Sequence, residues 1–195
     1  MFGNNTQISS SNFNILDVGG ADGTRARQSF PDCRIITIDK KYGWNIEVKG
    51  LMQGNWDVIF ANHIIEHLIN PDQFLEECKR VMHEHTILEI GTPNLTAWFN
   101  RILFLFGYVP HSVELSNRKA VGRAFNWNNE PLGGHIFIYT VPAFIQLLKL
   151  HGFKIISIEG EYSTYPCHPL IKIIDRVLTK LNVNMASTFR IRCTL

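Results

Sequence analysis

Short runs of apolar residues alternate along the chain with longer segments in which apolar residues recur every three or four positions. Runs this short and this apolar are typical of strands buried on both faces of a parallel sheet, and the longer segments are typical of amphipathic helices. The last run differs, because apolar and polar residues alternate strictly from Phe189 to Cys193, as in a strand with one more polar face. The predicted strands are 13–18, 34–38, 56–61, 86–90, 154–158 and 187–194.

The predicted helices carry recognisable start and stop residues. Asn70 precedes Pro71, and this pairing of an N-cap with a proline at the first helical position predicts a helix. Thr140 can cap a second helix that ends at Gly152, and residues 170–181 form a third amphipathic segment. Strands and helices alternating in this way predict an α/β fold with a doubly wound sheet.

Residues 94–134 interrupt this alternation. The segment is too long for an ordinary connection inside a compact domain, and it is rich in aromatic residues. We interpret it as an inserted lid with its own helix near 96–106, within a single domain that spans residues 1–195. An alternative is that residues 97–109 form a docking face for a membrane surface or for a second copy of the chain in a homodimer.

The composition narrows the class of protein. Hydrophobic residues make up 45% of the chain and charged residues 18%, which excludes a disordered chain. The formal net charge of +2 is too small to indicate a nucleic-acid partner by itself. The 4 cysteines form no CxxC pair, so neither a zinc site nor a disulfide framework is indicated. The chain shows no signal-peptide pattern and no apolar run of the roughly 20 residues that a membrane span needs, so we expect a cytoplasmic location.

The first predicted strand runs into a glycine-rich turn, DVGGADGT, at residues 17–24. Such a turn lets a ligand approach the backbone at the sheet edge where these folds bind. The turn does not fit the dinucleotide fingerprint, which requires glycine where Ala21 and Thr24 stand, and no Gly-Lys-Ser/Thr follows to make a P-loop. Asp39 ends the second predicted strand, where a carboxylate can accept both hydroxyls of a ribose. Asp17 and Asp39 taken separately could each be a simple loop cap, but with the turn they indicate a nucleoside-containing ligand.

These residues resemble a known family. ILDVGGADG, at 15–23, resembles the cofactor loop of class I S-adenosylmethionine-dependent methyltransferases, in particular the small-molecule branch called type 11. The resemblance continues through ITIDK at 36–40, residues 56–82, ILEIGTPN at 87–94 and residues 134–155. It implies a Rossmann-like seven-stranded sheet of order 3-2-1-4-5-7-6 with an antiparallel last strand. It also implies methyl transfer from S-adenosylmethionine to a small molecule, with an oxygen acceptor preferred.

The resemblance further implies which residues hold the methyl donor. Asp39 would bind the ribose hydroxyls, and Lys40 would lie beside the adenine. Asn62 and His63 would face the methionine end from the tip of the strand at 56–61. The residues that would line the donor from the glycine turn are Asp17, Gly19, Gly20, Ala21 and Gly23.

Two departures from the family pattern have consequences. Ala21 stands where the family usually has its middle glycine. The segment 42–55 is short, so we expect the third strand to be reduced, and Asn45 is the candidate for an adenine contact. These departures also motivate an alternative function, a non-catalytic binding module or partner subunit with the methyltransferase fold.

Histidines are the candidates for chemistry at the acceptor. Methyl transfer from a sulfonium is an in-line displacement in which the protein positions the partners and can remove one proton. His135 follows the glycines at the return of the insertion and is the first candidate base, and His67 is the second. The alternatives are a loop cap for His135 and a hydrogen-bonded loop lock for His67. His111, in the insertion, is a further residue that could face the acceptor.

Residues 63–67 fit the H-x-x-E-H pattern of inverted zinc peptidases. On a helix, His63 and His67 would be the metal ligands and Glu66 the base. The motif directly follows a buried strand, however, and the proline at position 71 follows closely. A zinc metallopeptidase is therefore the least favoured alternative, and we expect no metal site. The Asn-Pro-Pro-aromatic motif of the amino-group nucleic-acid methylators does not occur, so we expect no nucleic-acid partner.

Overall fold

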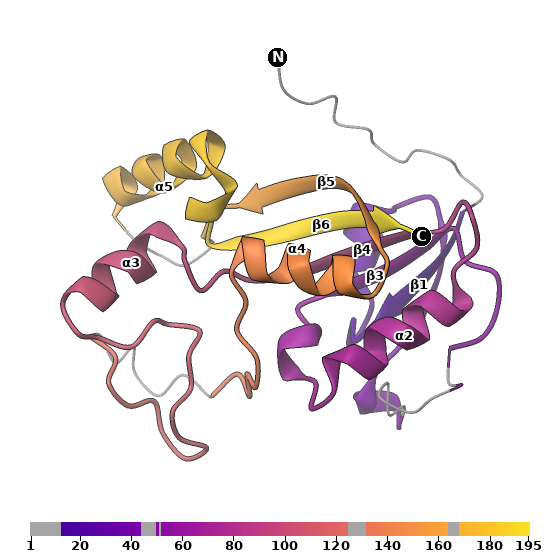
Figure 1. The fold of residues 1–195 in the computed structure, drawn as a ribbon, viewed down its shortest axis with the longest axis horizontal. Coiled ribbons are helices and arrows are strands. Elements are labelled where there is room, and N and C mark those ends of the chain that lie inside the picture. Colours follow the sequence, from indigo (N-terminus) through magenta and orange to yellow (C-terminus); the bar gives the residue numbers. More distant parts are fainter. Residues whose placement is uncertain (1–12, 44–49, 51, 125–131, 164–167) are drawn as a thin grey trace.

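The computed structural model describes residues 13–43, 50, 52–124, 132–163 and 168–195. These residues form a 6-stranded sheet of order β2-β1-β3-β4-β6-β5. The first four strands run parallel, and β6 is antiparallel to both of its neighbours (Figure 1). The strands are β1 (Asn14–Val18), β2 (Arg34–Ile38), β3 (Val58–Asn62), β4 (Ile87–Pro93), β5 (Lys154–Glu161) and β6 (Thr188–Thr194).

The sheet confirms the α/β class, the expected strand order and the antiparallel last strand. The expected count of seven strands is wrong for the described residues, which form 6. The observed order equals the expected one with the third strand removed from the edge beside β2. Residues 44–49 and 51, which belong to the short segment expected to carry that strand, lie outside the described residues, and Asn45 lies there too.

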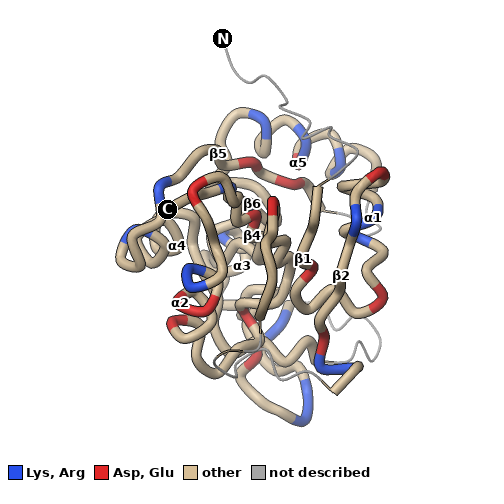
Figure 2. The backbone as a smooth tube through the Cα atoms, turned by 90° about the vertical axis from the view of Figure 1, so that its right-hand side faces the viewer, with Lys and Arg blue, Asp and Glu red and all other residues tan. Residues whose placement is uncertain are grey.

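Helices cover both faces of the sheet. The helices α2 (Pro71–Val81) and α4 (Val141–Leu150) pack on one face, where buried Phe74 and Phe144 join the larger hydrophobic core. The short helix α1 (Thr24–Ser29) packs on the other face, where Ala26 and Phe30 belong to a second, smaller core. Figure 2 shows this layering, with α2 and α4 on one side of the strands and α1 on the other.

The predicted caps of α2 and α4 are confirmed. Asn70 Oδ1 accepts a hydrogen bond from Gln73 N at 3.0 Å, and Thr140 Oγ1 accepts one from Ala143 N at 3.3 Å. Each bond satisfies a backbone donor that has no partner within its helix. Gly152 adopts φ +88° just beyond α4, the left-handed conformation in which glycine ends helices.

The remaining helices lie at one end of the sheet (Figure 1). The insertion contains α3 (Trp98–Leu105), shorter than the helix expected at 96–106, and α5 (Pro169–Leu181) follows β5. Trp98 Nε1 donates to Asp175 Oδ1 at 2.7 Å, so α3 is tied directly to α5. None of the described helices is long and apolar enough to span a bilayer. The three cysteines in the described part of the chain, Cys33, Cys78 and Cys193, are free thiols.

Candidate active site

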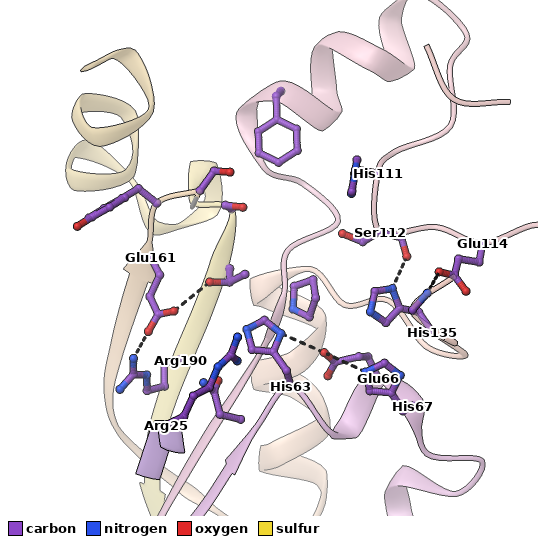
Figure 3. Close-up of a pocket in the computed structure, with 18 of the residues that line it drawn as sticks. Arg25, His63, Glu66, His67, His111, Ser112, Glu114, His135, Glu161 and Arg190 are labelled. Atoms are coloured by element: carbon purple, nitrogen blue, oxygen red, sulfur yellow. Dashed lines mark hydrogen bonds and ion pairs between the residues drawn. The ribbon is translucent and has the colours of Figure 1, made fainter. Parts of the chain in front are cut away.

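A cavity of about 710 Å³ opens at the carboxyl edge of the sheet (Figure 3). The ends of β3, β4 and β5 and the start of β6 reach it, and the insertion forms its opposite wall. Open α/β sheets bind their ligands at this edge, because the loops that follow the parallel strands converge there. The cavity therefore lies where the strand pattern predicts a site, and polar side chains make up much of its lining.

The glycine turn begins directly after β1 and has tight local geometry. Gly19 and Gly23 adopt φ +72° and +74°, conformations that side chains rarely adopt. A Cβ atom at Gly20 would lie 1.8 Å from the carboxylate of Asp17, so only glycine fits there. Ala21 has φ +53° and accommodates the loop although it is not the usual glycine. The turn therefore keeps a left-handed conformation at position 21 with alanine in place of glycine.

Asp17 is a buried acid at the base of this turn. Its side chain is 1% exposed, and Thr37 Oγ1 donates to Asp17 Oδ2 at 3.1 Å. Burial raises the pKa of Asp17 to about 6, against the opposing effects of the Thr37 hydrogen bond and of Arg27. The chain thus holds a carboxyl group in an environment that disfavours its charge.

Asp39 connects the end of β2 to the glycine turn. Its Oδ2 accepts a hydrogen bond from Ala21 N at 3.0 Å, and its Oδ1 accepts one from Lys41 N at 2.7 Å. A carboxylate has about four acceptor positions, so these two bonds leave capacity for two more donors. Lys40 begins a 3-10 turn next to Asp39, and its side chain is exposed.

Asn62 and His63 stand at the tip of β3 and line the cavity. His63 has φ +57°, an uncommon conformation for a residue other than glycine, and its N–H donates to Gly91 O at 2.9 Å. A Cβ at Gly91 would lie 2.3 Å from Asn62 Oδ1, so the adjacent strand makes room for the amide. Strained backbone of this kind often occurs at functional sites.

Glu66 is the centre of a cluster of histidines. Its side chain is fully buried, and its carboxylate accepts hydrogen bonds from His63 Nδ1 at 3.2 Å and from Thr92 Oγ1 at 3.1 Å. Burial alone would raise the pKa of Glu66, but the hydrogen bond and charge of His63 outweigh it and hold the pKa below its usual value. His67 Nε2 lies 3.9 Å from Glu66 Oε1.

His67 and His135 both line the cavity and lie side by side, with ring centroids 4.9 Å apart. His67 Nδ1 bonds to Gly134 O at 3.2 Å, and His135 Nδ1 bonds to Ser112 O at 2.9 Å. A carbonyl oxygen can only accept, so both Nδ1 atoms carry the proton. In the neutral rings the lone pair therefore lies on Nε2.

Glu114 of the insertion holds the backbone that immediately precedes His135. Its carboxylate accepts hydrogen bonds from the backbone N–H groups of Gly133 and Gly134, the residues that immediately precede His135. Ser112, two residues before Glu114, supplies the carbonyl that orients the His135 ring. The insertion thus both lines the cavity and fixes one of its histidines (Figure 3).

The predicted site residues fall into two neighbouring groups. Asn62, His63, His67 and His135 line the cavity, and so does His111. The residues of the glycine turn and of the tip of β2 do not line it; they form a second group at the carboxyl ends of β1 and β2, made of Asp17, Gly19, Gly20, Ala21, Gly23, Asp39 and Lys40. The same edge of the sheet carries both groups.

The structure also contains site residues that the sequence did not single out. Arg25, Glu161 and Arg190 line the cavity, and Glu114 joins them from the insertion. Polar residues at strand ends were the available signal for Glu161, but nothing local in the sequence shows that a carboxylate at position 114 reaches residues 133 and 134.

The H-x-x-E-H segment does not have metallopeptidase geometry. That geometry requires His63 and His67 on one face of a helix, whereas only Ile65–His67 form a turn, of the 3-10 type, and His63 precedes it with a positive φ. Glu66 Oε1 is hydrogen-bonded to His63 Nδ1, so the predicted metal ligand contacts the predicted base directly. The helical zinc peptidase alternative is therefore wrong.

The chain resembles known proteins in both sequence and fold. Residues 5–158 match a family model described as a methyltransferase domain. No curated protein matches the chain. An Archaeoglobus fulgidus SAM-dependent methyltransferase is 16% identical, with 94% of this chain and 86% of that chain covered and a TM-score of 0.56. An S-adenosylmethionine-dependent methyltransferase from Mesorhizobium loti is 12% identical, with 93% and 90% covered and a TM-score of 0.56.

A third solved structure is a complex of DhpI with SAM and HEP. It is 12% identical, 96% of this chain and 81% of that chain are covered, and the TM-score is 0.56. Identities this low show a shared fold, and the coverage shows that the likeness extends over nearly the whole chain.

Proposed function

The chain belongs to the class I S-adenosylmethionine-dependent methyltransferase family, and from this premise we propose that it methylates an oxygen of a small, polar molecule. The observation that carries the proposal is the arrangement of the two groups of residues. A donor group at the glycine turn adjoins a cavity that is lined by histidines and by several other polar residues. The small net charge, with acidic and basic residues interspersed over the backbone (Figure 2), favours a small molecule over a nucleic acid.

The glycine turn and the tip of β2 hold the donor in this proposal. Asp39 binds the ribose hydroxyls, since two of its acceptor positions remain open beside its bonds to Ala21 and Lys41. Lys40 lies at the adenine, and Asn62 and His63 face the methionine end from the tip of β3. The donor is lined from the turn by Asp17, Gly19, Gly20, Ala21 and Gly23.

His135 and His67 activate the acceptor in this proposal. S-adenosylmethionine supplies an electrophilic methyl group, and a hydroxyl acceptor must lose a proton as its oxygen attacks. Both rings present the Nε2 lone pair, because their Nδ1 atoms are committed to backbone carbonyls. Histidine suits this task near neutral pH, since its unperturbed pKa is about 6.5.

The insertion, residues 94–134, is the lid of a single domain in this proposal. Its support is that Phe99, His111, Ser112, Glu114 and Arg123 line the cavity from this segment. Arg123 lies 4.0 Å from Glu114, so the wall that faces the strand ends carries paired charges. Such a wall favours an acceptor with polar groups.

Calorimetry with S-adenosylmethionine tests the proposal. We expect saturable binding to the wild-type chain and a loss of about ten- to a hundredfold in affinity for Asp39→Asn, because a charged acceptor contributes roughly 1.5–3 kcal/mol. Asp32→Asn is the matched control, since Asp32 is exposed and precedes the opposite end of β2. Absence of binding at millimolar concentration would overturn the donor site and leave the non-catalytic module as the better account.

A further inference from the structure

Three side chains of the cavity converge on one point. Glu66, His67 and His135 each offer a donor atom, and these atoms lie within 4.8 Å of one another. They come from distant parts of the chain, because His135 follows the insertion whereas the other two follow β3. Two imidazoles and one carboxylate are a donor set that catalytic zinc sites use, with a fourth position left open.

The surroundings of the three side chains match those of metal ligands. Metal-bound histidines usually donate their other ring N–H to a carbonyl or carboxylate, which fixes the ring and its tautomer. His67 and His135 both do so, toward Gly134 O and Ser112 O, and each keeps its lone pair on Nε2. The second carboxylate oxygen of Glu66 is held by the Thr92 hydroxyl.

We propose that Glu66, His67 and His135 bind a divalent transition-metal cation, for which zinc fits the donor set best. Ligands of one tetrahedral zinc ion are roughly 3.4 Å apart, from bond lengths of about 2.1 Å, so closure needs rotamer adjustments of about an ångström. His67 and His135 are partly exposed to the cavity and have room to make them. This metal site differs from the expectation, drawn from the sequence, that no metal is bound.

The ion deepens the proposed function and rests on it. An ion at this point faces the acceptor cavity, and its chemistry there is that of a Lewis acid for an oxygen of the acceptor. With an ion bound, His67 and His135 would act as its ligands instead of as bases, and an acceptor hydroxyl on the ion would lose its proton to solvent water, because the ion would lower the pKa of that hydroxyl. His63 remains outside the ligand set, since its Nδ1 bonds to Glu66.

Metal binding to the full chain tests the inference without any assay of activity. The protein is stripped with a chelator, and zinc is titrated in competition with a chromophoric chelator. We expect one tight equivalent and, with cobalt in place of zinc, visible absorption from a site with nitrogen and oxygen ligands. His67→Ala and His135→Ala should each weaken zinc affinity by a hundredfold or more, since loss of an outer hydrogen-bond partner alone costs 10–100-fold.

His111→Ala is the matched control, because His111 lines the same cavity but is not one of the three clustered side chains. Its zinc affinity should stay within about twofold of wild type. Calorimetry with S-adenosylmethionine on the metal-free protein separates the two proposals. Donor binding with no zinc equivalent, or equal zinc affinity in all three variants, overturns the metal site and leaves the methyltransferase proposal standing. Binding of one zinc equivalent without binding of S-adenosylmethionine overturns only the methyltransferase proposal.

Discussion

Asp17 shows at the scale of one residue how a site can cost stability. Its pKa is about 6 in the folded chain and 3.8 in the unfolded reference. Between pH 3.8 and 6 the folded state therefore holds the proton that the unfolded state has lost, and stability falls as the pH rises. Above pH 6 the free energy of unfolding is lower by the full amount, about 3 kcal/mol.

We predict that Asp17→Asn stabilises the fold while weakening donor binding. The free energy of unfolding at pH 7 should rise by up to about 3 kcal/mol, because the buried charge is gone and Thr37 can still donate to the amide oxygen. Urea unfolding at several pH values between 4 and 7 measures this. The gain should vanish toward pH 4, and an equal gain at both ends would contradict the assigned cause.

Single residues also show which parts of the candidate site can be predicted from the sequence. The glycine turn and both acids could be placed at the strand ends, because a short apolar run ends in each case at a defined residue. The role of Glu66 could not, since its carboxylate is buried by contacts with His63 and with Thr92 of another strand. The sequence suggested only one role for Glu66, the base of a helical zinc motif, which was the least favoured alternative. The positive φ of His63 is incompatible with the helix that this motif requires.

At the scale of elements, the antiparallel part of the sheet carries an ion-pair network. Glu89 of β4 is fully buried and accepts hydrogen bonds from Arg190 Nη1 at 2.8 Å and from Arg192 Nε at 2.6 Å, both on β6. Arg190 also pairs with Glu161 of β5. The strict alternation of apolar and polar residues in the last predicted strand produces this ion-pair network, because the polar residues of the strand all point to one face of the sheet.

We predict that Glu89→Gln destabilises the fold by about 2–4 kcal/mol, since it leaves two partly buried guanidinium groups without their shared charge. Glu159→Gln is the matched control, because Glu159 lies 3.7 Å from Arg192 and its side chain is 47% exposed. Its effect should stay below about 0.5 kcal/mol. Thermal and urea unfolding of both variants measure the difference, and equal effects would show that burial does not control this network.

Elements were predicted best where local chemistry alone defines them. The caps at Asn70 and Thr140 predicted two helices, because a side-chain acceptor at the N-cap satisfies a backbone donor that has no partner within the helix. The sequence pattern does not predict α1. This helix has six residues, and its N-cap is Gly23, which has a left-handed conformation and provides no side-chain cap. Its position depends on packing of Ala26 and Phe30 against the sheet, which no local signal reports.

At the scale of the whole molecule, long-range contacts build the cavity. Ser112 orients His135 and Glu114 holds the two residues before it, across about twenty residues of insertion. The length of the insertion marked it as a functional segment, but the hydrogen bonds of Ser112 and Glu114 to residues 133–135 depend on a fold that spacing cannot supply. The position of the insertion could therefore be predicted from the sequence, whereas its internal contacts could not.

The end of the molecule formed by α3 and α5 exposes several large apolar side chains. Leu105 is 80% exposed, Phe106 70% and Leu181 76%. The acid of α5, Asp175, is buried and bonded to Trp98. The exposed charged residues of α5 are all cationic: Lys172, Arg176 and Lys180. Two such surfaces would repel each other in a homodimer, whereas apolar and cationic groups together favour an anionic membrane surface.

We therefore predict binding to vesicles that contain anionic lipid, measured by co-sedimentation. Lys172→Glu with Lys180→Glu should weaken it roughly thirtyfold or more, since each basic residue near the surface contributes about 1 kcal/mol. Lys154→Glu is the matched control, because Lys154 is also exposed but begins β5 at its opposite end from α5. Equal binding to neutral vesicles would contradict the cationic role. The like charges of α5 argue against a homodimer through this end of the molecule. A concentration-dependent dimer without vesicle binding would therefore contradict the prediction and would assign these apolar side chains to contact with a second copy.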